Sequence, residues 1–109
     1  DGAQLDCSGF TKGVMLSFGV EMPRNSSQQE TLGEKIERIE DSKTGDLVFY
    51  GLPTGNITHV GFTLRNGSTI KAVHARQRVR IDAIKPSGLP ESVEDNRVVK
   101  SIRRIVHFE

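Results

Sequence analysis

Hydrophobic residues near the start of the chain recur with a helical period. Phe10, Val14 and Phe18 are spaced by four residues, which predicts an amphipathic helix whose apolar stripe faces a core. Asp6 is a suitable N-cap residue, so Cys7 is expected in the first turn of this helix. Gly19, as the residue just past the helix end, and Pro23 are expected to end it.

A weaker helical pattern follows. Residues 25–29 are polar and offer several N-cap candidates. Three apolar residues then fall on one side of a helix over residues 31–39, namely Leu32, Ile36 and Ile39. This spacing predicts a short second helix, with its charged residues forming a solvated face.

The pattern changes to strands after residue 46. Residues 47–50 form a short apolar strand, and residues 59–64 and 68–74 flank Asn66-Gly67, a pair typical of a type I′ hairpin turn. Residues 79–82 and 98–108 also have strand character, with irregular chain between them. One antiparallel sheet packed by one or two N-terminal helices is the predicted architecture, which belongs to the α+β class.

The predicted hairpin brings two histidines together. A turn at Asn66-Gly67 pairs residues whose numbers sum to 133, so His59 is expected directly opposite His74, with Cβ atoms ~5 Å apart. Gly61 shares this face and leaves space for another element. One imidazole would then reach the other, although two histidines at a sheet edge without a chemical role remain the alternative.

Length and charge exclude several classes of protein. The 109 residues fit one domain with one core. Fifteen Lys and Arg against fourteen Asp and Glu give a net charge of +1, so no overall field recruits nucleic acid or an anionic membrane. No apolar run approaches the ~20 residues of a membrane span. The single cysteine cannot form an internal disulfide.

Cys7 and the two histidines are the candidate chemistry. A thiol in the first helical turn is expected to favour the thiolate, because the helix dipole is positive there. Cys7 as nucleophile, one histidine as base and a polar residue that orients the base are the parts of a thiol hydrolase, with the Cys7 N–H as an oxyanion donor. Geometry alone leaves open which histidine is the base.

Two other interpretations of these residues are open. A lone cysteine is often a small buried hydrophobic residue. Cys7, His59 and His74 are also acceptable zinc ligands, but the chain has no Cys-x-x-Cys or His-Glu-x-x-His pair. We therefore expect no metal and no cofactor.

Several motifs occur in an order and spacing typical of one family: Asp6-Cys7-Ser8-Gly9-Phe10, Pro23-Arg24 with Ser26, Ser27 and Gln28, Gly45-Asp46-Leu47-Val48-Phe49, His59-Val60-Gly61 and Val73-His74. Over about residues 5–82 the chain resembles the NlpC/P60 family of cell-wall cysteine peptidases. The resemblance implies a papain-like α+β fold, and hydrolysis of peptidoglycan stem peptides, typically at the γ-D-glutamyl to L-diamino acid bond, through an acyl-enzyme.

The resemblance also implies residue roles. Cys7 would be the nucleophile, His59 the base and His74 the orienting residue, which settles the order of the two histidines. Asp6 and Ser8 match positions that help to hold the free amine of the N-terminal L-alanine. A motif with a structural or site-supporting role is matched by Arg24 and Gln28. The substrate implies a secreted or cell-envelope location.

One departure concerns the start of the chain. Relatives commonly carry Tyr-x-Trp-Gly-Gly just before the cysteine motif, whereas this chain has no Trp and begins at Asp1. We expect residues 1–109 to be an NlpC/P60-like catalytic domain without that segment, which another part of a longer polypeptide could supply. A non-catalytic wall-binding module with the same fold is the alternative.

An alternating set of arginines is the last feature: Arg76, Arg78 and Arg80. On a strand they would line one face. They could meet substrate carboxylates, but a solvated, charge-blunted sheet edge is the favoured interpretation.

Overall fold

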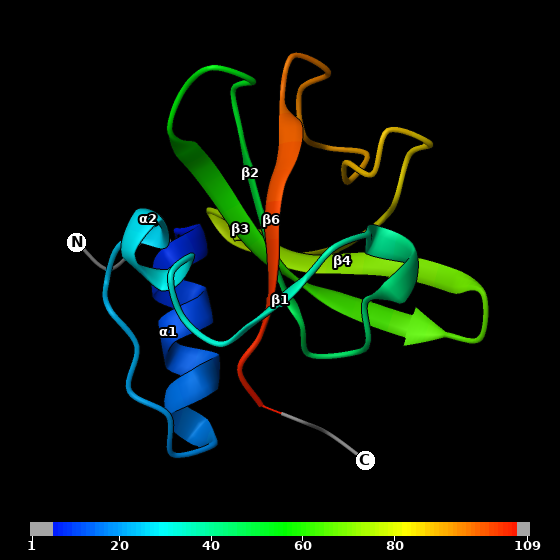
Figure 1. The fold of residues 1–109 in the computed structure, drawn as a ribbon. Helices are drawn as coiled ribbons and strands as arrows, with labels where there is room; N and C mark the ends of the chain where they lie inside the picture. The colour runs from blue at the N-terminus through cyan, green and yellow to red at the C-terminus, as the bar shows by residue number, and fades with distance from the viewer. Residues whose placement is uncertain (1–5, 107–109) are drawn as a thin grey trace.

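The computed structural model describes residues 6–106, which form one antiparallel sheet packed by two helices (Figure 1). The helices are α1 (Cys7–Ser17) and α2 (Ser26–Gln29), and a 3-10 turn, η1, spans Ile39–Asp41. The six strands are β1 (Glu34–Ile36), β2 (Leu47–Gly51), β3 (Ile57–Asn66), β4 (Thr69–Arg76), β5 (Arg78–Ala83) and β6 (Val98–Arg104). They lie in the order β1-β6-β2-β3-β4-β5, which confirms the predicted α+β class.

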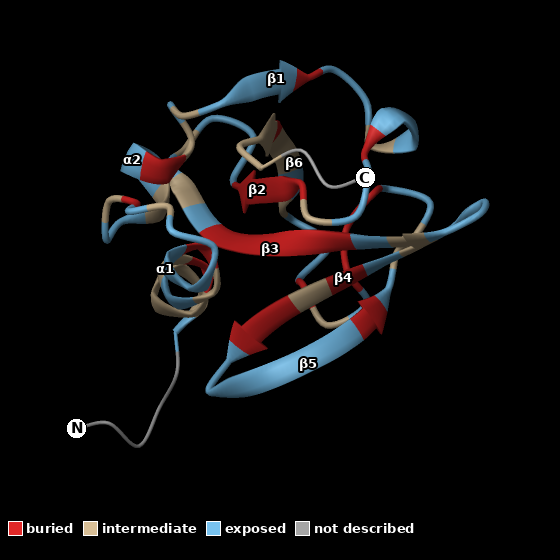
Figure 2. Ribbon diagram, turned by 90° about the horizontal axis from the view of Figure 1, so that it is seen from below, coloured by how far each residue is buried: buried red, intermediate tan, exposed pale blue. Residues whose placement is uncertain are grey.

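Both faces of the centre of the sheet are covered. Leu47 and Phe49 of β2 pack towards α1, which contacts β3 and β4. Val48 and Tyr50 point to the opposite face, where the irregular segment between β5 and β6 contributes Leu89 to a second cluster. Figure 2 shows the resulting run of buried residues along β2 and the middle of β3. This arrangement explains why the strand at residues 47–50 is apolar without alternation.

The start of α1 follows the prediction. The Oδ1 atom of Asp6 accepts a hydrogen bond from the N–H of Gly9 at 2.7 Å, so Asp6 is the N-cap and Cys7 is the first helical residue. The helix ends at Ser17, and Gly19 takes a φ of +82°, as expected of a glycine just past a helix end.

The buried side of α1 is rotated from the predicted stripe. Thr11 and Met15 are the buried residues, whereas Phe10 and Val14 pack at the margin of the core and Phe18 is 55% exposed. Successive helical residues are ~100° apart, so this shift of one residue moves the inward face by that angle. Phe10 still anchors the helix through an edge-on contact with Phe62, with ring centroids 5.9 Å apart.

The predicted helix over residues 31–39 is wrong. Helix α2 is a single turn that begins after Asn25, and Gly33 adopts a φ of +75°, which ends any helical continuation. The next residues form β1, in which Ile36 pairs with Ile102 of β6. Ile36 therefore serves the sheet, and partners more than sixty residues away override a weak local helical pattern.

The hairpin is present, but its register differs from the prediction. Asn66 is the last residue of β3 and pairs with Thr69, so Gly67 and Ser68 form the turn. Gly67 takes a φ of +63°, which suits a glycine in the first turn position. Paired residue numbers thus sum to 135, and His74 lies opposite Gly61 instead of His59. Because the sum changes by two, both histidines keep the predicted face.

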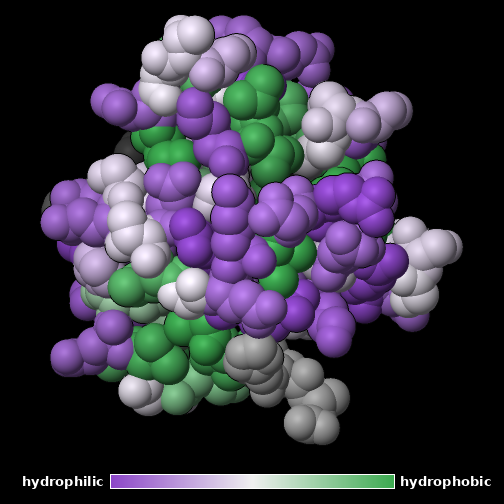
Figure 3. All heavy atoms as spheres, viewed as in Figure 1, coloured by the Kyte–Doolittle hydropathy of each residue, from purple (hydrophilic) through white to green (hydrophobic). Residues whose placement is uncertain are grey.

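The strands expected at residues 79–82 and 98–108 are present as β5 and β6, but β6 ends at Arg104, before residues 105 and 106; residues 107–109 lie outside the described range. Figure 3 shows hydrophilic side chains in the middle of one face, over β1 and β6, and hydrophobic ones near the end of α1. Leu16 and Phe18 are exposed at that end. No helix within residues 6–106 has the length and apolar character needed to cross a membrane.

Candidate active site

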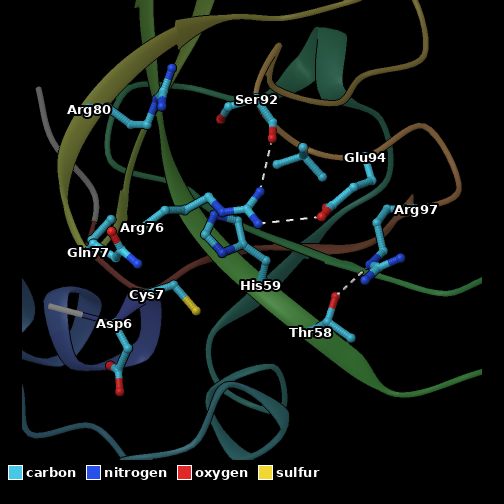
Figure 4. Close-up of a pocket in the computed structure, with 12 residues that line it drawn as sticks. Asp6, Cys7, Thr58, His59, Arg76, Gln77, Arg80, Ser92, Glu94 and Arg97 are labelled. Carbon is cyan, nitrogen blue, oxygen red and sulfur yellow. Dashed lines mark hydrogen bonds and ion pairs between the residues drawn. The ribbon is translucent and has the colours of Figure 1, made fainter. Parts of the chain in front are cut away.

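A pocket of about 770 Å³ opens at the start of α1 (Figure 4). Its walls come from the first residues of the helix, the start of β3, the turn between β4 and β5, and the segment before β6. The lining residues are Asp6, Cys7, Thr58, His59, Ala75, Arg76, Gln77, Arg80, Ser92, Val93, Glu94 and Arg97. Two of the three predicted catalytic residues, Cys7 and His59, therefore share one cavity.

Cys7 presents its sulfur to this pocket from the first turn of α1, near the ring of His59 (Figure 4). Burial raises the pKa of the Cys7 thiol, and the backbone N–H groups of Val60 and Ser8 only partly oppose this effect. The expectation of a thiolate favoured by the helix start is therefore wrong for the free protein. Desolvation of the half-buried Cys7 outweighs the backbone donors around its sulfur.

His59 and His74 are in direct contact. The Nε2 atom of His59 lies 2.6 Å from Nδ1 of His74, and the two rings meet edge to face with centroids 4.9 Å apart. The contact is diagonal across β3 and β4, because Gly61 occupies the position opposite His74. His59 borders the pocket, and His74 is fully buried behind it.

Asp82, which the sequence analysis placed on a strand but not in the site, extends this pair. Its Oδ2 atom lies 2.7 Å from Nε2 of His74 and accepts a hydrogen bond from the hydroxyl of Ser92. Its Oδ1 atom accepts from Nε of Arg80 at 3.2 Å. Burial alone would raise the pKa of Asp82, but the hydrogen bonds from Ser92, His74 and Arg80 together lower it to about 2.

No local signal in the sequence brings Asp82 to the site. A turn at Gln77 makes Arg76 pair with Arg78, and the same register places Asp82 opposite Ala72 and diagonal to His74. Gln77 has a φ of +72°, which glutamine rarely adopts, so nothing in its residue type marks a tight turn. The residue types alone therefore do not align β4 with β5.

Burial also controls the charge of the histidines. It lowers the pKa of His59 to about 4, with His74 and Arg76 adding to the effect. It lowers the pKa of His74 too, although Asp82 opposes the shift. Behind His59, the ring of buried Tyr50 stacks at a centroid distance of 6.0 Å. At neutral pH both imidazoles are therefore uncharged, and His59 has an unprotonated ring nitrogen.

Comparison with known proteins assigns the chain to a family. A sequence model of the NlpC/P60 family matches residues 1–97. The chain belongs to the NlpC/P60 family. Probable endopeptidase p60 of Listeria monocytogenes serovar 1/2a is 40% identical over 84 residues, which are 77% of this chain and 16% of p60.

Two further relatives differ in whether their names describe a catalytic protein. The gamma-D-glutamyl-L-lysine dipeptidyl-peptidase of Bacillus cereus is 32% identical over 92 residues, which are 83% of this chain and 27% of that protein. The structure of RipD from Mycobacterium tuberculosis, a non-catalytic NlpC/p60 domain protein adapted to peptidoglycan binding, superposes with a TM-score of 0.69 at 22% identity, covering 94% of this chain and 67% of RipD. This NlpC/P60 chain thus has the predicted papain-like fold but spans only 16% and 27% of the two curated relatives.

Asp6 and Ser8 are joined by Arg24 in this NlpC/P60 chain. Nη2 of Arg24 lies 2.7 Å from Oδ2 of Asp6, and its Nη1 donates to the Ser8 hydroxyl at 2.8 Å. Asp6 lines the pocket, whereas Ser8 lies beside it. Arg24 therefore organises the helix start, in line with the site-supporting role implied for it. The buried glutamine nearby is Gln29, not the Gln28 of the quoted motif.

The opposite wall of the pocket is rich in guanidinium groups. Arg76 and Arg80 line it as two of the alternating arginines, whereas Arg78 is exposed and outside the lining. Arg97, which the sequence analysis did not single out, completes this wall and donates to the Thr58 hydroxyl at 3.1 Å (Figure 4). The favoured interpretation of Arg76 and Arg80 as a solvated edge is therefore incomplete, because both are exposed into the pocket.

The side-chain arrangement gives no support to a zinc site. Within residues 6–106, no three His, Cys, Asp or Glu side chains converge as ligands. Nε2 of His59 and Nδ1 of His74 face each other, and Nε2 of His74 faces Asp82. Of these four ring nitrogens only Nδ1 of His59 has no partner in the chain of contacts, so the two rings contact each other and Asp82 instead of converging on one ion.

Proposed function

We propose that this chain is a cysteine peptidase that hydrolyses peptidoglycan stem peptides outside the cell or in its envelope. The supporting relatives are named endopeptidase p60 and gamma-D-glutamyl-L-lysine dipeptidyl-peptidase. The second name supports the γ-D-glutamyl to L-diamino acid bond as the target. The single observation that carries the proposal is a thiol at a helix start in the same cavity as His59, which is backed by buried His74.

In the proposed reaction, the sulfur of Cys7 attacks the carbonyl carbon of the target bond while His59 takes the thiol proton. The C–N bond breaks, His59 gives its proton to the leaving amine, and the acyl group stays on Cys7 as a thioester. His59 then takes a proton from water, whose oxygen attacks the thioester, and Cys7 is released as a thiol. The N–H of Cys7, which has no intrahelical partner as the first helical residue, is a donor for the oxyanion.

The charges on the two sides of Cys7 fit a stem peptide. Asp6 is 59% exposed at one side, and a carboxylate has room for several donors, so it can accept an ammonium group while Arg24 stays bound. Arg76, Arg80 and Arg97 lie on the other wall. Glu94 also lines the pocket and lies 3.5 Å from Arg76, which leaves this group of side chains with an excess of positive charge. A peptide with a free amine on the acyl side and carboxylates on the D-glutamyl and diamino acid residues matches this polarity.

Mass spectrometry of the products from defined stem peptides tests the proposal. L-Ala-γ-D-Glu peptides that continue with L-lysine or with meso-diaminopimelate are incubated with the wild-type chain and with Cys7→Ala. We expect cleavage after the γ-D-glutamyl residue by the wild type and none by Cys7→Ala. Equal hydrolysis by both proteins would contradict the proposal, as would cleavage at another bond.

A non-catalytic wall-binding module is the second candidate. It is favoured by the raised pKa of the Cys7 thiol, which weakens the sulfur as a nucleophile, and by the likeness in fold to RipD. Under this interpretation, purified peptidoglycan retains the chain without release of fragments. Alkylation of Cys7 would then leave binding unchanged, whereas a peptidase would lose its activity.

A further inference from the structure

A buried carboxylate lies at the inner end of the histidine pair. Asp82 is 6% exposed, and its two oxygens accept hydrogen bonds from Ser92 and Arg80. An ionised carboxylate has no hydrogen to donate. Because Nε2 of His74 lies 2.7 Å from Oδ2 of Asp82, the hydrogen of this contact must sit on the histidine nitrogen.

That hydrogen determines the rest of the chain of contacts. A neutral imidazole carries one N–H, so His74 with its hydrogen on Nε2 has a bare Nδ1 that can only accept. The atom facing it at 2.6 Å is Nε2 of His59, which must therefore donate. Neutral His59 then carries no hydrogen on Nδ1, its only ring nitrogen that is not engaged with His74.

We propose that Asp82 is a positioning residue that sets the tautomers of both His74 and His59, and so keeps Nδ1 of His59 free to accept a proton. The inference rests on the proposed function for its catalytic consequence, but the tautomers themselves do not depend on any substrate. Asp82 acts indirectly: it is not itself a lining residue of the pocket, and its hydrogen-bonded connection to His59 runs through His74.

The opposite set of tautomers shows why the direction matters. With its hydrogen on Nδ1, His74 would donate to Nε2 of His59, and neutral His59 would have to carry its own hydrogen on Nδ1. That nitrogen could not take a proton from Cys7. Both sets satisfy the contact between the histidines equally well, so the pair needs an acceptor at its far end to select one of them.

Substitution of Asp82 by asparagine separates this role from packing. The amide has nearly the same shape as the carboxylate, but one of its two ends donates. If its oxygen turns to accept from Arg80, its NH₂ group faces Nε2 of His74 and selects the opposite tautomers. Asp41→Asn is the matched control, because it makes the same change at a carboxylate of η1 that is 54% exposed, pairs with Arg38 and lies outside the pocket lining.

The test is imidazole nitrogen NMR at pH 7 on protein labelled with ¹⁵N-histidine. The sequence has only three histidines, so the His107→Asn background leaves the signals of His59 and His74. We expect hydrogen on Nε2 of both rings in the parent protein and in Asp41→Asn, and a change of tautomer in Asp82→Asn. Hydrogen on Nδ1 of His59 in the parent protein would overturn the inference, as would unchanged tautomers in Asp82→Asn.

Kinetics with a defined stem peptide provide the second readout. Asp82→Asn should lower kcat by about a hundredfold or more, the scale of a lost general base, with little change in KM. Asp41→Asn should stay within a few-fold of the parent. A fall in kcat with native tautomers retained would overturn the inference in favour of a purely structural role. A parent protein that hydrolyses nothing would count against the peptidase function alone, because the NMR result stands without substrate.

Discussion

Gly61 lies directly opposite His74 in the pairing of β3 with β4, and a Cβ atom at Gly61 would lie 3.0 Å from the Cβ of His74. Real Cβ atoms seldom approach another side chain this closely, so Gly61→Ala should displace His74 and break its alignment with His59. We expect a loss of about tenfold or more in kcat/KM, because small misplacements in a catalytic group are costly. Peptide hydrolysis and thermal unfolding of the variant measure the effect.

Gly13→Ala is the control for that substitution. Gly13 is exposed within α1, and a Cβ there meets nothing within 4 Å. The change should leave hydrolysis unaltered and stabilise the protein by up to about 1 kcal/mol, since alanine favours a helix over glycine. Equal activity of the two variants would show that the close packing of His74 is not needed.

The buried imidazole predicts an unusual pH profile. The pKa of His59 is lowered to about 4, so the base becomes protonated, and activity falls, only as the pH drops through about 4. An unperturbed histidine would place this limb near 6.5. The pH dependence of kcat/KM, which reports groups of the free enzyme, measures it, with circular dichroism at each pH to verify folding. An acid limb near 6.5 in folded protein would contradict the assignment.

Thiol alkylation tests the state of the nucleophile. Burial raises the pKa of Cys7, so its reaction with iodoacetamide should be slow at pH 7 and accelerate beyond pH 9, the ordinary value for the group. A thiolate held by a protonated His59 would instead react quickly below pH 7. Fast alkylation at pH 5 to 6 would show that the two groups exist as an ion pair.

Asp46, from the Gly-Asp-Leu-Val-Phe motif, should matter for stability. It is 1% exposed and receives two hydrogen bonds of 2.8 Å from Arg104 and one of 2.8 Å from the N–H of Lys43. Asp46→Ala leaves the Arg104 guanidinium without its buried partner and should lower the free energy of unfolding by about 3 kcal/mol or more. Urea denaturation measures it.

The control for Asp46 is an exposed pair. Asp95 is 88% exposed and lies 2.6 Å from Nζ of Lys85. Asp95→Ala should change the free energy of unfolding by less than about 1 kcal/mol, as is typical of surface ion pairs. Similar losses in both variants would mean that burial of the Asp46–Arg104 pair does not increase its contribution to the free energy of unfolding.

Arg97 provides a test of substrate polarity. Arg97→Met removes a charge from the pocket wall opposite Asp6 and should raise KM about tenfold for a stem peptide with free carboxylates, the scale of one charged hydrogen bond. A peptide with amidated carboxylates should bind the variant and the wild type equally well. An equal rise in KM for both peptides would assign Arg97 to the shape of the pocket instead.

Local patterns in the sequence were enough to predict α1, its N-cap and the alternation within the hairpin. They failed where distant partners decide the structure. The apolar spacing around Ile36 fits a helix as well as a strand, and only pairing with Ile102 of β6 selects the strand. The register of the hairpin depended on whether Asn66 or Gly67 begins the turn, which the residue types alone do not decide.

In the site, too, features set by local sequence were predictable and features set by distant partners were not. The contact between His59 and His74 was predictable from period and turn, and it survived the error in register because the sum of paired numbers changed by two. Asp82 and Ser92 were out of reach, because they join the site through a second hairpin and an irregular segment. The raised pKa of Cys7 depends on burial, which a motif does not reveal.

A covalent intermediate on Cys7 is the central claim, and intact-protein mass spectrometry after rapid acid quench tests it most directly. During turnover of an L-Ala-γ-D-Glu stem peptide, we predict an adduct on Cys7 with the mass of the acyl fragment, absent from Cys7→Ser. Product formation without any adduct, together with undiminished hydrolysis by Cys7→Ser, would contradict the account.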